Sequence, residues 1–241
     1  MVKRLYQLVF GVGILLTTLA AGIAIWPDLE AQNFSQTFRG RDRTRLSCPI
    51  AMTADEVSQV RISLNNPLER RVRFAAISFI SFGGQTSTPA EDREEIYIEP
   101  GASDSVAWEI DRTNTVYGFM VLARVYVFRS GRVPSQAGTC GVWWIGADWA
   151  SRLRLSGQAL YTLLTAAGLG CLALGGVKVS DTRNPFSLYD NTTSRPRFGV
   201  VFSGALLLGL ALGIWGMPLA ALGALTLAVL LLLGLIDRPD F

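Results

Sequence analysis

The run LVFGVGILLTTLAAGIAIW, residues 8–26, is nineteen residues long and contains no charged side chain. A helix of this length rises about 28 Å, which matches the roughly 30 Å hydrocarbon core of a bilayer. The apolar core of a signal peptide is shorter, about 7–15 residues, so we interpret this run as an uncleaved anchor. Three further uncharged apolar runs have similar lengths and lie at 159–177, 198–215 and 219–236. The pattern predicts a polytopic membrane protein with four transmembrane helices.

Basic residues flank the first run and gather between the second and third runs. They are Lys3, Arg4, Lys178, Arg183, Arg195 and Arg197. Short cytoplasmic flanks carry an excess of Lys and Arg, so we expect both termini and this loop in the cytoplasm of a plasma or inner membrane. The polar insert between the first two runs is then periplasmic or extracellular.

This reading divides the chain into six segments. They are the cytoplasmic N-terminus with the first helix at 1–26, the exported domain with its linkers at 27–156, the second helix at 157–177, a cytoplasmic loop at 178–197, a hairpin of the third and fourth helices at 198–236, and a cytoplasmic tail at 237–241.

Short runs of alternating apolar and polar residues fill the insert from Leu46 onward. Period-two alternation is typical of strands with one buried face, and a continuous apolar run is typical of a strand buried on both faces. The expected strands cover 60–64, 72–82, 96–98, 106–110, 116–128 and 138–145, of which 116–128 is the nearly continuous one. Such strands, separated by turns over about 100 residues, predict an antiparallel sandwich of two sheets.

Two stretches of the insert carry a resemblance to a known family. VSQVRISLNNP, at 57–67, ends a strand in an Asn-Pro turn, and IYIEPGASDSVAWEI, at 96–110, opens a strand after a Pro-Gly turn. This pattern resembles bacterial immunoglobulin-like domains and covers roughly residues 46–145. The resemblance implies an immunoglobulin-like β-sandwich inserted between the first two helices, and it implies no functional residues. It names no family for the whole chain.

Cys48 and Cys140 are the only cysteines of the insert and flank nearly all of the expected sandwich, whereas Cys171 lies in the second apolar run. A disulfide persists on the exported side of a membrane, so we expect Cys48 and Cys140 to be bonded and Cys171 to be free. The alternative is a pair of free thiols. A metal site is not expected, because two isolated cysteines offer too few ligands.

The chain contains no histidine among its 241 residues. Its composition therefore excludes Ser-His-Asp and Cys-His catalysis and His-ligated metals. The insert, residues 27–156, holds 15 Arg against 15 Asp plus Glu, so it is neutral and lacks the basic footprint of a nucleic-acid-binding domain. We expect no catalytic residue, no cofactor and no nucleic-acid partner.

One acidic cluster stands apart in the insert and consists of Glu91, Asp92, Glu94 and Glu95. Paired carboxylates could form a glycosidase-like or calcium site. The favoured interpretation is an exposed acidic loop between two strands.

Small residues recur at helical spacing in the apolar runs and allow helices to approach closely. The expected packing residues are Ala167, Gly175, Gly209, Gly213, Ala220 and Ala224. They serve either contacts among the chain's own helices or contacts with another subunit. Tryptophans near the ends of the first two runs are expected to anchor in the membrane interface, and these are Trp26, Trp143, Trp144 and Trp149.

These observations favour a non-enzymatic accessory or scaffold subunit of a membrane protein complex. The expected partners are other membrane-protein subunits, which would dock on the sandwich and on small-residue helix faces, and the lipid bilayer. The alternatives are a ligand-sensing membrane receptor and an auxiliary subunit of a channel or transporter.

Overall fold

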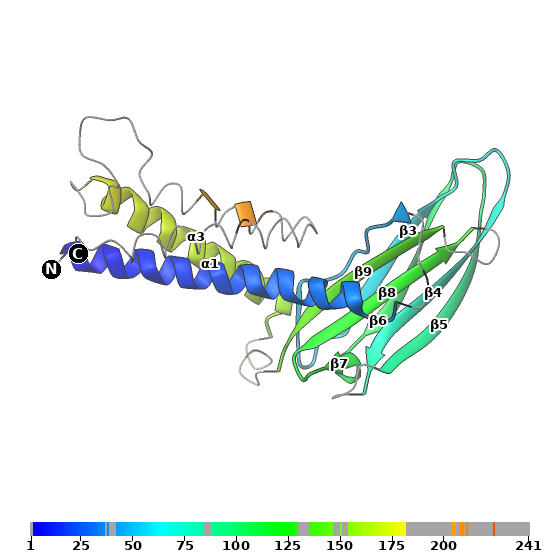
Figure 1. The fold of residues 1–241 in the computed structure, drawn as a ribbon, viewed down its shortest axis with the longest axis horizontal. Helices are drawn as coiled ribbons and strands as arrows, with labels where there is room; N and C mark the ends of the chain where they lie inside the picture. Colours follow the sequence, from blue (N-terminus) through cyan, green and yellow to red (C-terminus); the bar gives the residue numbers. More distant parts are fainter. Residues whose placement is uncertain are drawn as a thin grey trace. The chain divides into compact units, whose positions relative to one another are not determined.

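The computed structural model describes residues 2–36, 38, 42–83, 88–129, 135–146, 150, 154–181 and the single positions 204, 205, 208, 209, 211 and 224. The chain divides into two units (Figure 1). The first combines Met1–Ile25 with Leu160–Phe241, and the second is Trp26–Ala159.

Two described helices are long and apolar enough to cross a membrane. Helix α1 covers Val2–Asn33 and helix α3 covers Gly157–Asp181, and their candidate spans are Leu8–Asn33 and Gly157–Gly175. The described residues therefore contain two candidate spans, by length and composition, and do not support the expectation of four transmembrane helices. The third and fourth expected runs lie outside the described residues except for six positions, which are helical.

Within the first unit, α1 and α3 approach each other at glycines. A Cβ atom added to Gly13 would lie 2.6 Å from the backbone nitrogen of Leu172, and one added to Gly175 would lie 2.7 Å from Cβ of Phe10. Such distances are below van der Waals contact, so the backbones can come this close only where a side chain is missing.

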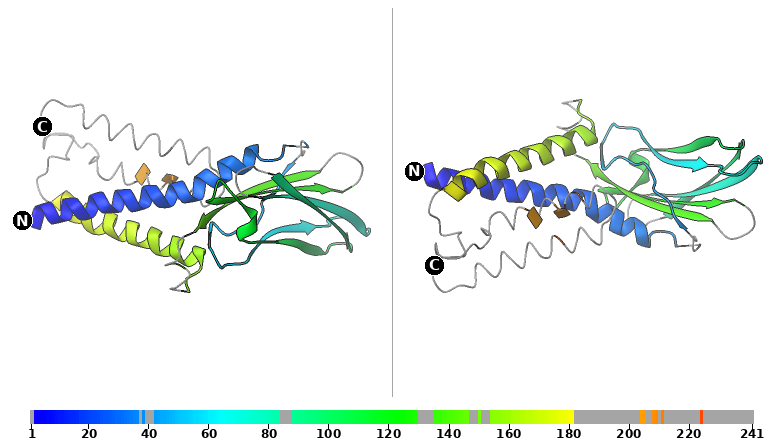
Figure 2. Two further views of the ribbon diagram at one scale, coloured as in Figure 1. Left: turned by 90° about the horizontal axis from the view of Figure 1, so that it is seen from below. Right: turned by 90° about the horizontal axis from the view of Figure 1, so that it is seen from above.

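The described residues of the second unit form nine strands in two sheets that lie face to face (Figure 2). The strands are β1 Asp42–Arg43, β2 Ala51–Thr53, β3 Ser58–Asn65, β4 Val72–Phe82, β5 Thr88–Ile98, β6 Ser103–Ile110, β7 Thr115–Val116, β8 Met120–Phe128 and β9 Gln136–Ile145; a short 3-10 helix, η1, covers Arg112–Asn114. The larger sheet has the order β1-β9-β8-β4-β5, with β2 paired to β9 and β7 paired to β8, and the smaller sheet is β3-β6.

Alternate residues of β3 and β6, which pair in the smaller sheet, line one side of the core between the sheets. In β3 these are Val60, Ile62 and Leu64, which are at most 2% exposed, and their counterparts in β6 include Trp108 and Ile110. Because successive side chains of a strand point to opposite faces, this alternation fixes the inner face of each sheet. A β-sandwich of two sheets is thus the architecture of the insert.

The disulfide between Cys48 and Cys140 ties the strand that ends the domain to the segment before β2. The bond is formed, with a Cα–Cα distance of 6.6 Å, and closes a loop with a sequence separation of 92. In the chain-entropy model, a crosslink over a loop of this length stabilises the fold by about 4–5 kcal/mol. Cys171 is free.

Two expectations about the strands were wrong. The sheets are not wholly antiparallel, because β1 and β2 each pair with β9 in parallel. Nor is 116–128 a single strand: Tyr117 (φ 54°) and Gly118 (φ 75°) adopt left-handed backbone and turn the chain from β7 into β8. Two consecutive positive φ angles are typical of a tight hairpin turn, and they interrupt what the apolar run suggested.

The acidic segment is also not a loop. Glu91, Asp92, Glu94 and Glu95 lie within β5, which pairs with β4 over its whole length. These four side chains are exposed, and β5 is the last strand in the order of its sheet. Charges on an edge strand discourage pairing with other chains, which explains why a strand here lacks the usual apolar alternation.

Candidate functional site

The last turns of α1 lie on the outer face of the larger sheet and form a second apolar cluster with it. The cluster includes Ala31, which lies in α1, and Phe34, which directly follows α1. Both are at most 6% exposed. The sheet contributes Phe79, Val116, Met120, Leu122 and Tyr126. These contacts bury the apolar residues of an otherwise polar helix end and stabilise the continuation of α1 past Trp26 to Asn33, beyond the end of the apolar run.

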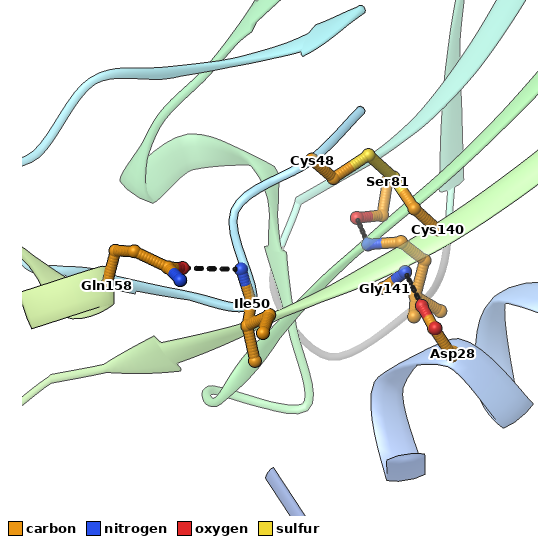
Figure 3. The surroundings of a disulfide bond; sticks show 8 residues. Asp28, Cys48, Ile50, Ser81, Cys140, Gly141 and Gln158 are labelled. Carbon is orange, nitrogen blue, oxygen red and sulfur yellow. Dashed lines mark hydrogen bonds between the residues drawn. A yellow bond between two sulfur atoms is a disulfide. The ribbon is translucent and has the colours of Figure 1, made fainter. Parts of the chain in front are cut away.

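The tightest approach in this cluster is between α1 and Gly141 of β9. A Cβ atom on Gly141 would lie 2.0 Å from the carbonyl carbon of Pro27, so a side chain has no room. The Gly141 N–H donates a hydrogen bond of 2.9 Å to Oδ1 of Asp28 (Figure 3). Gly141 follows Cys140 directly, and the helix therefore rests beside the disulfide.

Strand β8 caps the end of α1. Nη1 of Arg124 donates hydrogen bonds to the carbonyl oxygens of Gln32 (3.2 Å) and Phe34 (2.7 Å). The last carbonyls of a helix have no partner within it and carry partial negative charge, so a guanidinium is a favourable cap. The hydroxyl of the fully buried Tyr126 donates to the carbonyl of Ser35 (3.0 Å), which extends the attachment beyond the helix.

A separate set of contacts holds the start of α3 against β2. Oε2 of Glu56 accepts hydrogen bonds from the backbone N–H groups of Gly157 (2.8 Å) and Thr53 (3.0 Å). Oε1 of Gln158 accepts one from the N–H of Ile50 at 3.1 Å (Figure 3). A carboxylate at a helix N-terminus satisfies unpaired N–H groups and complements the helix dipole. Gly157 is also a close approach, because a Cβ atom there would meet Met52 at 2.3 Å.

The four tryptophans that are expected to anchor in the membrane interface differ in exposure. Trp26 is 56% exposed, Trp143 and Trp144 are half-buried, and Trp149 lies outside the described residues. Trp143 contacts Phe119, with ring centroids 5.2 Å apart. Their role at a membrane surface stays a prediction.

The residues that are expected to pack between helices also differ in burial. Gly175 is buried against Phe10, whereas Ala167 is exposed and its neighbour Gly168 approaches Thr17 of α1 instead. Gly209 and Ala224 are buried. Gly213 and Ala220 lie outside the described residues.

The acidic residues of β5 do not converge. Neighbouring strand residues point to opposite faces, so Asp92 and Glu94 lie on one face and Glu91 and Glu95 on the other. Arg73 donates a hydrogen bond to Glu95 and lowers the pKa of that carboxyl, with Arg93 adding a second ion pair at 3.1 Å. Among the residues that the structure describes, no three of His, Cys, Asp and Glu gather as metal ligands.

The attachment residues Asp28, Glu56, Arg124 and Gln158 were missed by the sequence reasoning. Each is a single polar residue without a motif, and its partner is a backbone group that no pattern reveals. One signal was available for Arg124, since a charged side chain interrupts the apolar run of β8 and half-buried charges need a partner.

Neither a protein-family model nor a curated protein matches the chain. Two solved structures each match less than half of the chain. The CARDB domain of a Pyrococcus furiosus protein, solved with two metal ions, is 10% identical with a TM-score of 0.33 and covers 42% of this chain and 84% of that one. A β-glucosidase from Listeria innocua, solved with glucose, is 16% identical with a TM-score of 0.30, and the match covers 42% of this chain and 15% of that one. At these values, neither the metal ions nor the sugar of those proteins transfers to this chain.

Proposed function

We propose that this protein is a non-enzymatic accessory or scaffold subunit of a membrane protein complex. Its sandwich lies on the exported side of a plasma or inner membrane, and its termini and the 178–197 loop lie in the cytoplasm. The observation that carries the proposal is that the partly buried side chains of Asp28, Glu56 and Arg124 bind backbone groups where the sandwich meets the ends of two apolar helices. These side chains attach the domain; they do not line a reaction site.

The attachment is energetically consistent with a structural role. Arg124, Glu56 and Asp28 each bond backbone N–H or carbonyl groups, and leaving one such group unpaired costs about 1–3 kcal/mol. Together with the disulfide, these contacts hold the sandwich to both of its helix ends. A domain held in this way is suited to presenting a surface to a neighbouring subunit.

The surface offered to a partner includes β5. Its exposed residues combine charges with Tyr97, which is 52% exposed and lies beneath the guanidinium of Arg71 at 5.0 Å. The charges of β5 discourage another strand from pairing with its edge, but they leave its side-chain surface free for a partner, and aromatic residues with a polar rim are common in protein interfaces. We therefore place the docking face on β5 and its hairpin with β4.

Photo-crosslinking in native membranes tests this proposal. A crosslinking amino acid at Tyr97 is expected to yield an adduct with a different chain, and one at the exposed Asp104 of β6, on the other sheet, serves as the comparison position. The particle extracted in mild detergent is expected to exceed the 26.2 kDa chain and its detergent. A lone chain in the particle, with no adduct from either position, would contradict the proposed role.

A further inference from the structure

The ends of both helices meet the sandwich at one level of strand β9. Pro27 of α1 rests on Gly141, and the carbonyl of Ile50 accepts a hydrogen bond from the N–H of Trp143 (2.9 Å). Ile50 in turn binds Gln158 in the first turn of α3. Residues 141–145 of β9 therefore mark the level at which both apolar helices reach the domain.

A cluster of three aromatic rings lies at the same level. It consists of Tyr117, Phe119 and Trp143, with ring centroids 6.4 Å apart between the first two and 5.2 Å apart between the last two. The Trp144 N–H donates to the carbonyl of Phe119 at 2.8 Å, which fixes the β7–β8 turn beside the end of β9. Tyr117 is 51% exposed and Phe119 is 37% exposed.

The rings of Tyr117 and Phe119 are exposed because both residues lie in the turn between β7 and β8. Left-handed angles at Tyr117 and Gly118 carry the turn beyond the first residue of β8, where Met120 pairs with Trp143. Leaving a large apolar side chain in water instead of burying it forgoes about 1.5–3 kcal/mol. Tyr and Trp rings are stabilised at the headgroup level of a bilayer, where an apolar body and a polar edge are both accommodated.

We propose that the cluster of Tyr117, Phe119 and Trp143 inserts into the outer headgroup region of the bilayer, as a third contact beside the two helices. The inference rests on the proposed membrane anchoring of α1 and α3. The proposed binding partner of the cluster is lipid, because the cluster lies at the level of β9 where the apolar run of α1 ends and α3 begins. The β7–β8 turn is then the part of the sandwich that contacts the membrane.

Fluorescent labelling in lipid vesicles tests the inference. The full chain carrying Cys171→Ser and Tyr117→Cys is labelled with an environment-sensitive dye and reconstituted in phosphatidylcholine vesicles that contain a shallow nitroxide lipid. The label is expected to show a blue-shifted emission and a loss of fluorescence to the nitroxide. Phe119→Cys is a second labelled variant that avoids the left-handed position, and formation of the Cys48–Cys140 bond on a non-reducing gel reports folding.

Two control positions separate the possible outcomes. Tyr97→Cys, an equally exposed ring at the far end of the larger sheet, is expected to stay unquenched, and Leu163→Cys, which is 56% exposed in α3, is expected to be quenched by a deep nitroxide. Quenching at 163 without quenching at 117 and 119 overturns only the inference. No quenching at 163 overturns the membrane anchoring itself. If the label at position 117 is shielded from water in native membranes but not in vesicles, the contact is with a protein partner, and the proposed lipid contact is overturned.

Discussion

Gly141 is the residue on which the contact between α1 and the sheet depends most directly. Replacing it with Ala would place Cβ inside Pro27, so either the helix or β9 must shift. Overpacking of this kind typically costs about 1–3 kcal/mol. We expect Gly141→Ala to lower the melting temperature of the detergent-solubilised chain, measured by near-ultraviolet circular dichroism.

Gly22→Ala is the matched control for Gly141→Ala. A Cβ atom at Gly22 of α1 would have no atom within 4 Å outside its own helix and chain neighbours. Its melting temperature is expected to equal that of the wild type. Equal melting temperatures for the two variants would show that Gly141 is not a critical contact.

Glu56 is the residue that ties the start of α3 to β2. Glu56→Gln keeps one carbonyl oxygen as acceptor but loses the charge beside the helix N-terminus, which is worth roughly 0.3–1 kcal/mol. Glu56→Ala removes the acceptor and is expected to cost about 1–3 kcal/mol. Chemical denaturation should rank the variants in this order. Glu99→Ala, which breaks an exposed ion pair with Arg71, should change stability by less than about 0.5 kcal/mol, and a larger loss there than at Glu56 would contradict the assignment.

Glu95 is the residue with a lowered pKa on β5, and it predicts a pH dependence. A folded-state pKa below the usual value of 4.5 means that the ion pair with Arg73 stabilises the fold above that pH. The contribution is lost as the pH falls through the folded-state pKa. The difference in melting temperature between wild type and Glu95→Gln should therefore shrink on acidification, and Glu91→Gln on the same strand is the comparison. A difference that grows on acidification would reverse the sign and exclude this cause.

Strands with one buried face were the elements that could be predicted from the sequence. Val60, Ile62 and Leu64 alternate with polar residues because only one face of β3 is buried. This alternation in the sequence indicates both the strand and its buried face. Strand β5 was not fully predicted, because residues 89–95 are exposed on both faces and leave no alternation. The parallel pairing of β2 also escaped, because three residues carry too little pattern to fix a partner.

The attachment site was harder to predict than the strands for a related reason. The disulfide followed from the placement of two cysteines, but Arg124 and Glu56 bind backbone groups far away in the sequence. Nearly every residue has the same backbone carbonyl and N–H groups, so no residue type in the sequence identifies which of them a side chain binds. Helix α1 also continues past the boundary that was expected at residue 26, through Pro27 to Asn33.

The glycines of α3 predict which face of this helix packs against α1. Gly175→Leu would drive a side chain into the backbone of Phe10, whereas a Cβ atom at Gly170 would have nothing within 4 Å beyond its own helix and chain neighbours. We expect Gly175→Leu to lower the thermal stability and the monodispersity of the extracted protein, and Gly170→Leu to leave both unchanged. Because the two substitutions add the same apolar surface, they differ only in the face on which they add it. The same loss in both variants would assign the effect to the added leucine and not to helix packing.

At the scale of the whole molecule, the disulfide and the basic residues favour the same proposed topology by independent arguments. A disulfide such as Cys48–Cys140 persists in an oxidising compartment, so we expect the sandwich outside, and from the excess of Lys and Arg we expect Lys3 and Arg195 inside. In a Cys171→Ser background, a membrane-impermeant maleimide is expected to label Asp104→Cys in intact cells, but to label Lys3→Cys and Arg195→Cys only after permeabilisation. Labelling of positions 3 and 104 from the same side would contradict a single crossing by α1. Labelling of 104 only after permeabilisation would place the disulfide in a reducing compartment, where it could not persist, and would overturn the exported domain on which the proposed function depends.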